Sequence, residues 1–593
     1  MCGLSGEVRF DGRRPELATI ERMTDELEDR GPDGRGVWSQ GAVALGHRRL
    51  KIIDLSESGA QPMTDPQLGI TGVFNGCIYN YRDLRGRLEG YGHRFFSDSD
   101  TEVLLKAYGQ WGHGCVEHLL GMFAFAVAEH HTGRVVLGRD RLGIKPLYLT
   151  RNGDRLRFAS SLPALLAGGG VDTSLDPVAL HQYLSWHGTV AAPRTVLSGV
   201  RKLPQATVRV VERDGAYRDH RYWQPTYTRH SELGDDPELW REAVLDALRT
   251  AVRRRTVADV PVGVLLSGGL DSSLIVALLA EAGHTDMATF AMGFEAESGE
   301  EGDEFRYSDM VARQFSTEHN QFLIPSDRLP AALEAAIGAM SEPMVSHDAV
   351  AFHLLAEQVA KEVKVVLCGQ GADEVFAGYR WYPRIAAAAR ADAADAYATV
   401  YFDRTHAGVE DLLCRDVLAG RDVSRDFVRA HMAAPGAETA LDAALRLDVH
   451  ALMADDPVKR VDNMTMAWGL EARVPFLDHE LVELAAACPP ELKLPQGGKT
   501  VLKDIGRTIL PREVVDRPKG YFPVPAVRHM AEPVLTRVRE ALTAPEARRR
   551  GLFDQGRLAE LLKDPARHRT TRGASTLWQV ASLEIWLQTH GVN

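Results

Sequence analysis

Short apolar runs alternate with helical patterns in the second half of this chain, and this alternation limits the possible fold more than any other feature. The runs and the helical stretches lie at 262–266, 274–282, 288–292, 352–361 and 364–368. Strands that alternate with helices form a parallel sheet, because each crossover helix returns the chain to the same end of the sheet. We therefore predict a doubly wound parallel sheet here. Further helices are expected at 386–454 and beyond residue 475.

The first half of the chain has a different pattern. From residue 1 to about 223, short β-type runs such as 42–45, 72–79 and 135–138 are separated by Gly, Asp and Pro turns. This pattern predicts sheets with few helices. The stretch 225–236 lacks apolar periodicity and is expected to be a linker. It ends with Asp235 and Asp236, the two candidate N-caps for an amphipathic helix over 240–252.

Length and composition exclude several classes of protein. A chain of 593 residues is expected to form two to four domains. Its formal net charge is −12 without a dense Lys/Arg block, which argues against nucleic acid or an anionic membrane as the main partner. The six cysteines show neither CxxC nor zinc spacing, so reduced thiols are expected. No segment approaches the ~18 apolar residues that span a bilayer, and a cytoplasmic protein is predicted.

Cys2 combines two reactive groups if Met1 is removed. Its thiol and a free α-amine would then belong to one residue. An α-amine titrates near about 7.8 and a thiol near about 8.5, so the amine can take the thiol proton at neutral pH. Cys2 is thus a candidate nucleophile with its own base. The dipeptide alone is a weak signal, since a small residue after the initiator is common.

A glycine-rich turn follows the first strand of the second half and opens a helix. The turn is Ser267-Gly268-Gly269-Leu270-Asp271-Ser272-Ser273. Backbone N–H groups, hydroxyls and a helix N-terminus at one point form an anion site, which predicts phosphate binding. It is not a Walker A loop: Gly498-Lys499-Thr500 matches the end of that motif, but Lys493 replaces its first glycine. The turn resembles the PP-loop of ATP pyrophosphatases, which release pyrophosphate on adenylating a substrate.

A second acidic loop follows the strand at 364–368. It contains Asp373 in the run Gly-Gln-Gly-Ala-Asp-Glu. Doubly wound sheets place ligands at the carboxyl ends of neighbouring strands, so Asp373 and Asp271 are expected to lie close together. Two carboxylates at that point predict a shared Mg²⁺ that neutralises pyrophosphate.

These motifs together resemble those of one family. The chain is similar to the glutamine-hydrolysing asparagine synthetases over most of its length. The resemblance implies a class II glutaminase domain of the Ntn-hydrolase type, an αββα sandwich, at 1–223. A linker at 224–236 and an ATP-dependent synthetase domain at 237–593 would follow. It also implies a carbon–nitrogen ligase that uses glutamine, ATP and Mg²⁺, and it is compatible with a homodimer.

The resemblance assigns roles in glutamine hydrolysis to five residues. Cys2 would attack the side-chain amide of glutamine. Arg49 would hold the α-carboxylate by a bidentate fork, and Asp100 would bind the α-amine. Asn75 and Gly76 would supply the donors of an oxyanion hole.

In the second half, the resemblance assigns the phosphates of ATP to the glycine-rich turn and adenosine to nearby backbone. These residues are Ser267, Gly268, Gly269, Asp271, Ser272 and Ser273 for the phosphates, and Leu265, Met292 and Gly369 for adenosine. Lys499 matches a family lysine that meets charge near the adenylate. Residues 460–478 would line the synthetase site and the base of an ammonia tunnel, which keeps ammonia unprotonated and concentrated.

Two positions depart from the family pattern. The usual Ser-Gly-Glu-Gly of the second acidic loop reads Cys-Gly-Gln-Gly here, and the amide of Gln370 cannot act as a general base. Cys77 stands where the family usually has a glutamate after the Asn-Gly pair. Both changes leave the glutaminase and adenylation residues in place, so they favour a different carboxylate acceptor over an inactive enzyme. Gln370 is assigned to the acceptor pocket.

Three runs suggest which acceptor this is. VFNGCIYNYR, LCGQGADEVFAGYRWYP and VDRPKGYFPVP most resemble the N-acetylglutaminylglutamine amidotransferases. That resemblance implies amidation of an acetylated dipeptide used as an osmoprotectant.

Three other functions share some of these sequence features. Asparagine synthesis from aspartate would need another group in the place of the family glutamate. A cyclase similar to β-lactam synthetase has no use for a glutaminase, and the intact glutaminase residues argue against it. A regulatory module that binds glutamine or nucleotide without turnover is disfavoured by the retained nucleophile and oxyanion donors.

Overall fold

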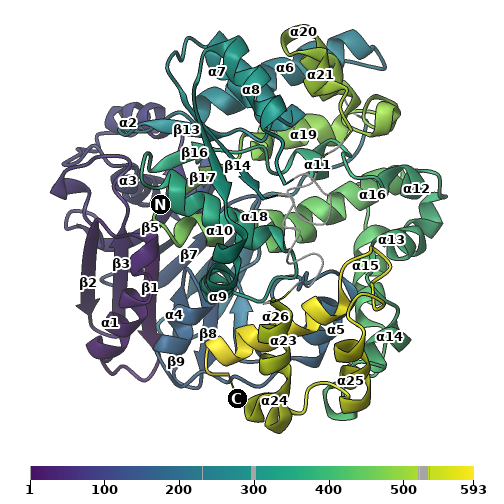
Figure 1. The fold of residues 1–593 in the computed structure, drawn as a ribbon. Coiled ribbons are helices and arrows are strands. Elements are labelled where there is room, and N and C mark those ends of the chain that lie inside the picture. The colour runs from purple at the N-terminus through teal and green to yellow at the C-terminus, as the bar shows by residue number, and fades with distance from the viewer. Residues whose placement is uncertain are drawn as a thin grey trace.

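The computed structural model describes residues 2–229, 232–295, 302–518, 520, 532 and 534–592 (Figure 1). In Figure 1 the first half, in purple and blue, lies beside the second half, in teal, green and yellow. None of the described helices has both the length and the apolar content that crossing a bilayer requires.

Two antiparallel six-stranded sheets form the centre of the first half. The order of the first sheet is β10 (Val200–Lys202), β8 (Tyr148–Asn152), β9 (Arg155–Ala159), β1 (Gly3–Arg9), β3 (Val43–Arg49) and β2 (Gly34–Gln40). The order of the second sheet is β12 (Tyr217–Arg221), β11 (Thr207–Val211), β7 (Val135–Arg139), β6 (Gly121–Glu129), β5 (Ile70–Ile78) and β4 (Met63–Asp65).

The two sheets pack face to face over an apolar layer. Leu4 and Val8 alternate along β1, and they share a buried cluster with Val73 of β5 and Ala126 of β6. Ser5 and Glu7 point to the opposite face of β1 and are buried too, with the Ser5 hydroxyl 3.0 Å from the hydroxyl of Thr24 on α1, so this strand is covered on both faces. Helices α1 (Leu17–Asp25) and α4 (Leu162–Ala167) contact the first sheet, and α3 (Asp100–Trp111) contacts the second, next to α2 (Tyr81–Gly90). The predicted αββα sandwich is confirmed.

A five-stranded parallel sheet organises the second half. Its order is β15 (Glu318–Ile324), β14 (Ala288–Phe294), β13 (Val262–Leu265), β16 (Val365–Leu367) and β17 (Glu471–Arg473). The strand order therefore reverses between β13 and β16, which is where doubly wound sheets bind ligands. The predicted doubly wound sheet is confirmed, although its two edge strands were not expected.

Helices pack around this sheet. They include α6 (Pro237–Arg254), α7 (Leu270–Glu281), α8 (Phe305–Phe315), α9 (Leu329–Ala339), α10 (Asp348–Val359), α18 (Pro457–Met466) and α19 (His479–Ala487). The side chain of Asp236 caps α6 by accepting the N–H of Glu238 at 2.9 Å. The segment 386–454 is largely helical, as predicted.

The last helix joins the two halves. Helix α26 (Thr576–Thr589) is buried along most of its length, and it contacts α9 and α23 (Val534–Thr543). Gln579 of α26 donates its side-chain amide to the carbonyl of Tyr183 at 3.0 Å, and the Tyr183 hydroxyl donates to the Gln579 carbonyl at 3.0 Å. Tyr183 belongs to α5 (Pro177–Ser185) of the first half.

Buried ion pairs also cross between the halves. Arg30 and Lys145 of the first half each lie 3.0 Å from a carboxylate oxygen of Asp462 on α18. Burial raises the pKa of Asp462, but the two cations outweigh burial and the pKa is lowered overall. Lys202 of the first half pairs in the same way with Glu342 and Asp455. The two halves thus neutralise each other's buried charges.

Candidate functional site

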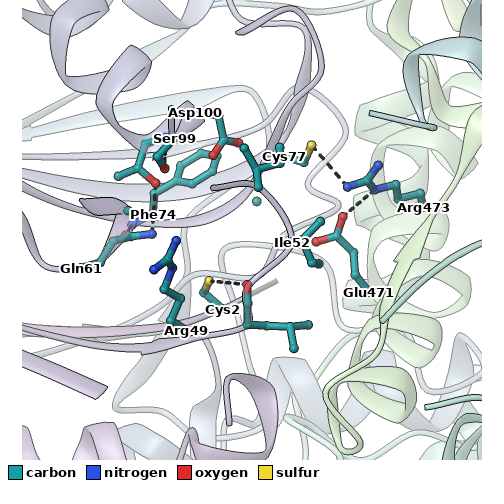
Figure 2. Close-up of a pocket in the computed structure, with 15 residues that line it drawn as sticks. Cys2, Arg49, Ile52, Gln61, Phe74, Cys77, Ser99, Asp100, Glu471 and Arg473 are labelled. Atoms are coloured by element: carbon teal, nitrogen blue, oxygen red, sulfur yellow. Dashed lines mark hydrogen bonds and ion pairs between the residues drawn. The ribbon is translucent and has the colours of Figure 1, made fainter. Parts of the chain in front are cut away.

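Cys2 lies directly before β1, at the bottom of a pocket between the two halves (Figure 2). Its N–H donates to the side-chain oxygen of Asn75 at 3.2 Å, and its thiol faces the carbonyl of Leu50 at 4.0 Å. Burial raises the pKa of the Cys2 thiol. A group that removes the thiol proton is therefore needed if this sulfur is to act as a nucleophile.

Arg49 enters the same pocket from the end of β3. Its guanidinium donates to the carbonyl of Ser56 at 2.7 Å and to the carbonyl of Asp54. Asp54 and Ser56 belong to a loop over 51–60, which we call the cover loop. Three residues of this loop, Ile52, Ile53 and Gly59, line the pocket. The guanidinium of Arg49 thus lines the pocket and donates hydrogen bonds to backbone carbonyls of the cover loop.

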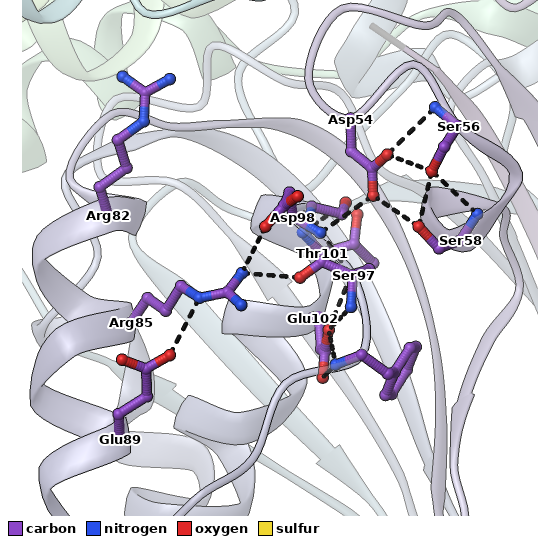
Figure 3. Close-up of polar contacts among 12 residues, drawn as sticks. Asp54, Ser56, Ser58, Arg82, Arg85, Glu89, Ser97, Asp98, Thr101 and Glu102 are labelled. Carbon is purple, nitrogen blue, oxygen red and sulfur yellow. Dashed lines mark hydrogen bonds and ion pairs between the residues drawn. The ribbon is translucent and has the colours of Figure 1, made fainter.

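The carboxylate of Asp54 holds the cover loop together (Figure 3). It accepts the N–H of Ser56 at 3.1 Å and the hydroxyl of Ser58 at 3.1 Å. It also accepts the N–H of Asp98 at 3.1 Å, two residues before the start of α3. The cover loop is therefore tied to the segment that carries Asp100.

Asp100 begins α3 and lines the pocket opposite Arg49 (Figure 2). Its carboxylate accepts the N–H of Ile78 at 3.0 Å. Burial raises the pKa of Asp100 to about 7, and the hydrogen bond from Ile78 opposes that rise. Gly76 of β5 lines the pocket as well. The structure thus brings Cys2, Arg49, Gly76 and Asp100 to one pocket, and Asn75 bonds to Cys2.

Sequence reasoning missed two residues of the pocket wall. Glu471 and Arg473 of β17 line the pocket of Cys2, although the sequence placed their segment at the synthetase site and the tunnel base. Arg473 donates to Glu471 and, at 3.6 Å, to the sulfur of Cys77. Burial raises the pKa of Glu471, but neighbouring cations including Arg473 and Lys145 lower it to about 2. No local pattern reveals a wall that comes from the far half of the chain.

Gln61 was also missed. Its side-chain oxygen accepts the N–H of Phe74 at 2.6 Å, and its amide donates to the hydroxyl of Thr101 at 3.1 Å. It thereby joins β5 to the start of α3. Gln61 carries no motif that would mark it as a pocket residue.

The glycine-rich turn lies at the carboxyl end of β13 and opens α7, as predicted. The hydroxyl of Ser267 accepts the N–H of Gly269 at 3.3 Å and lies 3.2 Å from the hydroxyl of Ser272. Gly268 has φ +69°, and a β-carbon there would come within 2.5 Å of the backbone nitrogen of Ser308. Only glycine fits that position.

Lys499 joins the glycine-rich turn to the second acidic loop. Its ammonium lies 2.7 Å from Asp271 and 2.9 Å from Asp373. Burial lowers the pKa of Lys499, but the two carboxylates outweigh burial and raise it well above its usual value. Both carboxylates converge on one cation, so they fit a shared divalent metal ion as well. Asp271 and Asp373 are thus brought together as expected.

The predicted adenosine contacts lie at the same end of the sheet. Leu265 ends β13 opposite Phe290, and Met292 lies two residues farther along β14. Gly369 and Gln370 follow β16, on the other side of β13, and precede the short helix α11 (Ala372–Val375). These positions surround the point where the strand order reverses.

Three further polar residues near this site were not predicted. Arg517 donates to Glu304 at 2.8 Å, and a β-carbon on Gly269 would lie 3.8 Å from its guanidinium. Glu374 accepts the hydroxyl of Tyr379 at 2.6 Å, and burial together with Asp373 raises its pKa to about 7. Arg517 belongs to the run VDRPKGYFPVP, most of whose later residues lie outside the described part of the chain.

Comparisons with known proteins match both halves. A glutamine amidotransferase domain model matches residues 1–223, and an asparagine synthase model matches residues 243–588. Asparagine synthetase [glutamine-hydrolyzing] 3 of Bacillus subtilis (strain 168) is 30% identical, over 100% of this chain and 99% of the relative. A putative asparagine synthetase [glutamine-hydrolyzing] of Mycobacterium tuberculosis (strain ATCC 25618 / H37Rv) is 31% identical, over 89% and 88%.

One solved structure is more distant. Glutamine phosphoribosylpyrophosphate amidotransferase from B. subtilis, complexed with ADP and GMP, aligns with a TM-score of 0.30 at 15% identity. The alignment covers 55% of this chain and 91% of that chain. By its matched domains and its full-length relatives, this chain belongs to the glutamine-hydrolysing asparagine synthetase family and is an ATP-dependent ligase that uses glutamine.

Proposed function

We propose that the pocket of Cys2 hydrolyses glutamine and that Cys2 becomes the N-terminal residue on loss of Met1. The α-amine takes the thiol proton, the sulfur attacks the side-chain amide carbon, and the α-ammonium then gives its proton to the amide nitrogen, which leaves as ammonia while the thioester forms. Water then releases glutamate. The support is the convergence of Cys2, Arg49, Gly76 and Asp100 on one pocket, with Asn75 in contact with Cys2.

Substrate contacts follow from the same geometry. The α-carboxylate of glutamine pairs with the guanidinium of Arg49, whose orientation is fixed by the carbonyls of Asp54 and Ser56. The α-ammonium pairs with Asp100. The backbone at Gly76 and the side chain of Asn75 stabilise the oxyanion.

The second site activates a carboxylate with ATP. An oxygen of the acceptor carboxylate attacks the α-phosphorus, and pyrophosphate leaves. Ammonia then attacks the acyl carbon, AMP leaves, and the nitrogen loses a proton. We assign the phosphates to Ser267, Gly268, Gly269, Ser272 and Ser273, and charge near the adenylate to Lys499. Mg²⁺ held by Asp271 and Asp373 would neutralise the pyrophosphate.

The acceptor we favour is N-acetylglutaminylglutamine. The observation that carries this choice is Gln370, an amide after β16 in the position where the family has a glutamate. The change beside the oxyanion motif, Cys77, agrees with a divergent branch. A second candidate is aspartate, because the full-length relatives are named asparagine synthetases.

Product analysis decides between the two acceptors. The purified protein is incubated with glutamine, ATP and Mg²⁺ and with either aspartate or N-acetylglutaminylglutamine. Pyrophosphate release and the mass of the amide product are measured. We expect amidation of the dipeptide and no turnover of aspartate. Asparagine formation with the dipeptide inert would overturn the acceptor assignment and leave the ligase assignment intact.

We also propose the division into a glutaminase domain at 1–223, a linker at 224–236 and a synthetase domain at 237–593. Ammonia passes between the sites inside the protein, along residues of 460–478. The support is that Glu471 and Arg473 line the pocket of Cys2 while β17 pairs with β16, which leads to Gln370. Free ammonia would mostly be protonated in solvent at pH 7, and an enclosed path avoids that loss.

A further inference from the structure

A short segment of the synthetase half forms two hydrogen bonds with the cover loop of the Cys2 pocket. Asp259 lies between α6 and β13. Its N–H donates to the carbonyl of Ile52 at 2.8 Å, and its carboxylate accepts the N–H of Asp54 at 2.8 Å. Ile52 lines the pocket, and the carbonyl of Asp54 binds the guanidinium of Arg49. Asp259 therefore contacts the residue of the cover loop whose carbonyl binds the guanidinium of Arg49.

Asp54, the residue whose N–H Asp259 binds, has an unfavourable backbone conformation. Asp54 has φ +52°, a left-handed conformation that is unfavourable for a non-glycine residue. Its side chain is used within the loop and on Asp98 (Figure 3). The N–H of Asp54 is satisfied by Asp259. Loss of that acceptor would remove one support of this backbone conformation.

The segment that carries Asp259 is fixed from the other side of the same pocket. Arg473 donates to the carbonyl of Arg255 at 2.8 Å and to the carbonyl of Val257 at 2.7 Å. Arg473 itself lines the pocket beside Cys77. The segment 255–259 thus bridges two walls of the Cys2 pocket.

The same segment leads straight to the ATP site. Three residues after Asp259 the chain enters β13, and two residues after β13 it reaches Ser267 of the glycine-rich turn. Strand β13 pairs on both sides, with β14 and β16, which makes it a stiff connection between Asp259 and the turn. A shift of β13 caused by nucleotide at the turn would move Asp259 relative to the cover loop.

We infer that Asp259 is a positioning residue through which the ATP site controls how firmly the cover loop closes over glutamine. The inference rests on the proposed glutaminase role of the Cys2 pocket. Its consequence is that glutamine is bound and hydrolysed best when the other site holds ATP and acceptor. Hydrolysis of glutamine only when ATP and acceptor are bound would limit the release of ammonia that no acceptor can use.

The test compares Asp259→Ala with Arg82→Ala. Arg82 lies 3.8 Å from the carboxylate of Asp259 and is largely exposed. Its replacement removes a charge next to Asp259 but keeps the two hydrogen bonds between Asp259 and the cover loop. Initial rates of glutamate release are measured against glutamine concentration, with and without ATP, Mg²⁺ and acceptor. Amide synthesis from ammonium chloride in place of glutamine is measured in parallel.

We expect Asp259→Ala to raise the KM for glutamine roughly three- to tenfold, as for loss of one hydrogen bond, and to weaken the stimulation by ATP and acceptor. Ammonia-dependent synthesis should be unchanged. Arg82→Ala should resemble the wild type. Asp259→Asn keeps an oxygen that can accept the N–H of Asp54, and it should restore most of the glutamine KM.

Several results would overturn the inference. These are an unchanged glutamine KM in Asp259→Ala, a wild-type glutaminase rate indifferent to ATP and acceptor, or a parallel loss of ammonia-dependent synthesis, which would indicate a general structural role. A wild-type protein that hydrolyses no glutamine would instead refute the proposed function. The two failures are therefore distinguishable.

Discussion

The backbone carbonyl of Arg473 accepts the N–H of Cys368 at 2.9 Å, while the side chain of Arg473 lines the pocket of Cys2. Cys368 lies two residues before Gln370 in the second acidic loop. A single residue therefore contacts both the wall of one site and the base of the other. The paired strands β16 and β17 therefore connect the wall of the Cys2 pocket with the second acidic loop.

The first prediction concerns the nucleophile. Cys2→Ala should abolish glutamine-dependent amide synthesis and leave ammonia-dependent synthesis close to wild type, because the synthetase residues are untouched. Glutamate release and amide formation are measured with each nitrogen source. Cys414→Ala is the matched control, since Cys414 is partly exposed and lies outside both sites. Glutamine use by Cys2→Ala would refute the assigned nucleophile.

The second prediction concerns the shared cation. Lys499→Met leaves Asp271 and Asp373 facing each other without their ammonium. We expect pyrophosphate release to fall by about 100-fold or more, as for loss of one charged stabilising group. Glutamine hydrolysis without ATP should persist.

Two further measurements sharpen the Lys499 result. Lys361→Ala, at an exposed lysine, should release pyrophosphate at the wild-type rate. The Mg²⁺ concentration for half-maximal activity should rise in Asp271→Asn and in Asp373→Asn, because each loses a charged ligand. Unchanged Mg²⁺ dependence in both variants would exclude them as ligands.

The third prediction concerns pH. Burial raises the pKa of Asp100 to about 7, and only its ionised form pairs with the α-ammonium of glutamine. The carboxyl is mostly protonated below that pH and ionised above it. The KM for glutamine should therefore fall as the pH rises from about 6 to 8. Asp100→Asn should raise the KM and remove this dependence, which glutamate release at each pH measures.

The fourth prediction concerns Gly59 of the cover loop. A β-carbon at this position would come within 2.3 Å of the guanidinium of Arg49. Gly59→Ala should displace that guanidinium and raise the KM for glutamine. The kcat of amide synthesis from ammonia should change little. Gly86→Ala is the matched control: it lies in α2 with open space around it, and alanine should add roughly 0.5–1 kcal/mol of stability there. Equal glutamine KM values for the two variants would contradict the crowding of Arg49.

The sequence predicted what local chemistry determines. Strand β13, the turn at Ser267 and helix α7 follow from an apolar run, two glycines and a helical pattern that adjoin one another. The edge strand β15 was not predicted because its residues are mostly polar or exposed. Strand β17 has only three residues, two of them charged, and it is buried because Arg473 and Glu471 pair.

The candidate sites divide in the same way. Cys2, Arg49, Asn75, Gly76 and Asp100 each lie in a recognisable short run. The contact between Arg473 and Cys77 joins residues 396 positions apart, and no run of sequence encodes it. The hydrogen bonds of Asp259 with Ile52 and Asp54 also depend on how the two halves pack.

The ion pairs that cross between the halves restrict how such a chain can be rebuilt. Asp462 pairs with Arg30 and Lys145 of the first half, and Glu342 and Asp455 share Lys202 of the first half and Lys459 of the second. A synthetase half transplanted onto a foreign glutaminase would bury Asp462 without either of its cations, at a cost of several kcal/mol, and would leave Lys459 alone to balance Glu342 and Asp455. The two halves therefore have to be inherited, exchanged or engineered as a matched set.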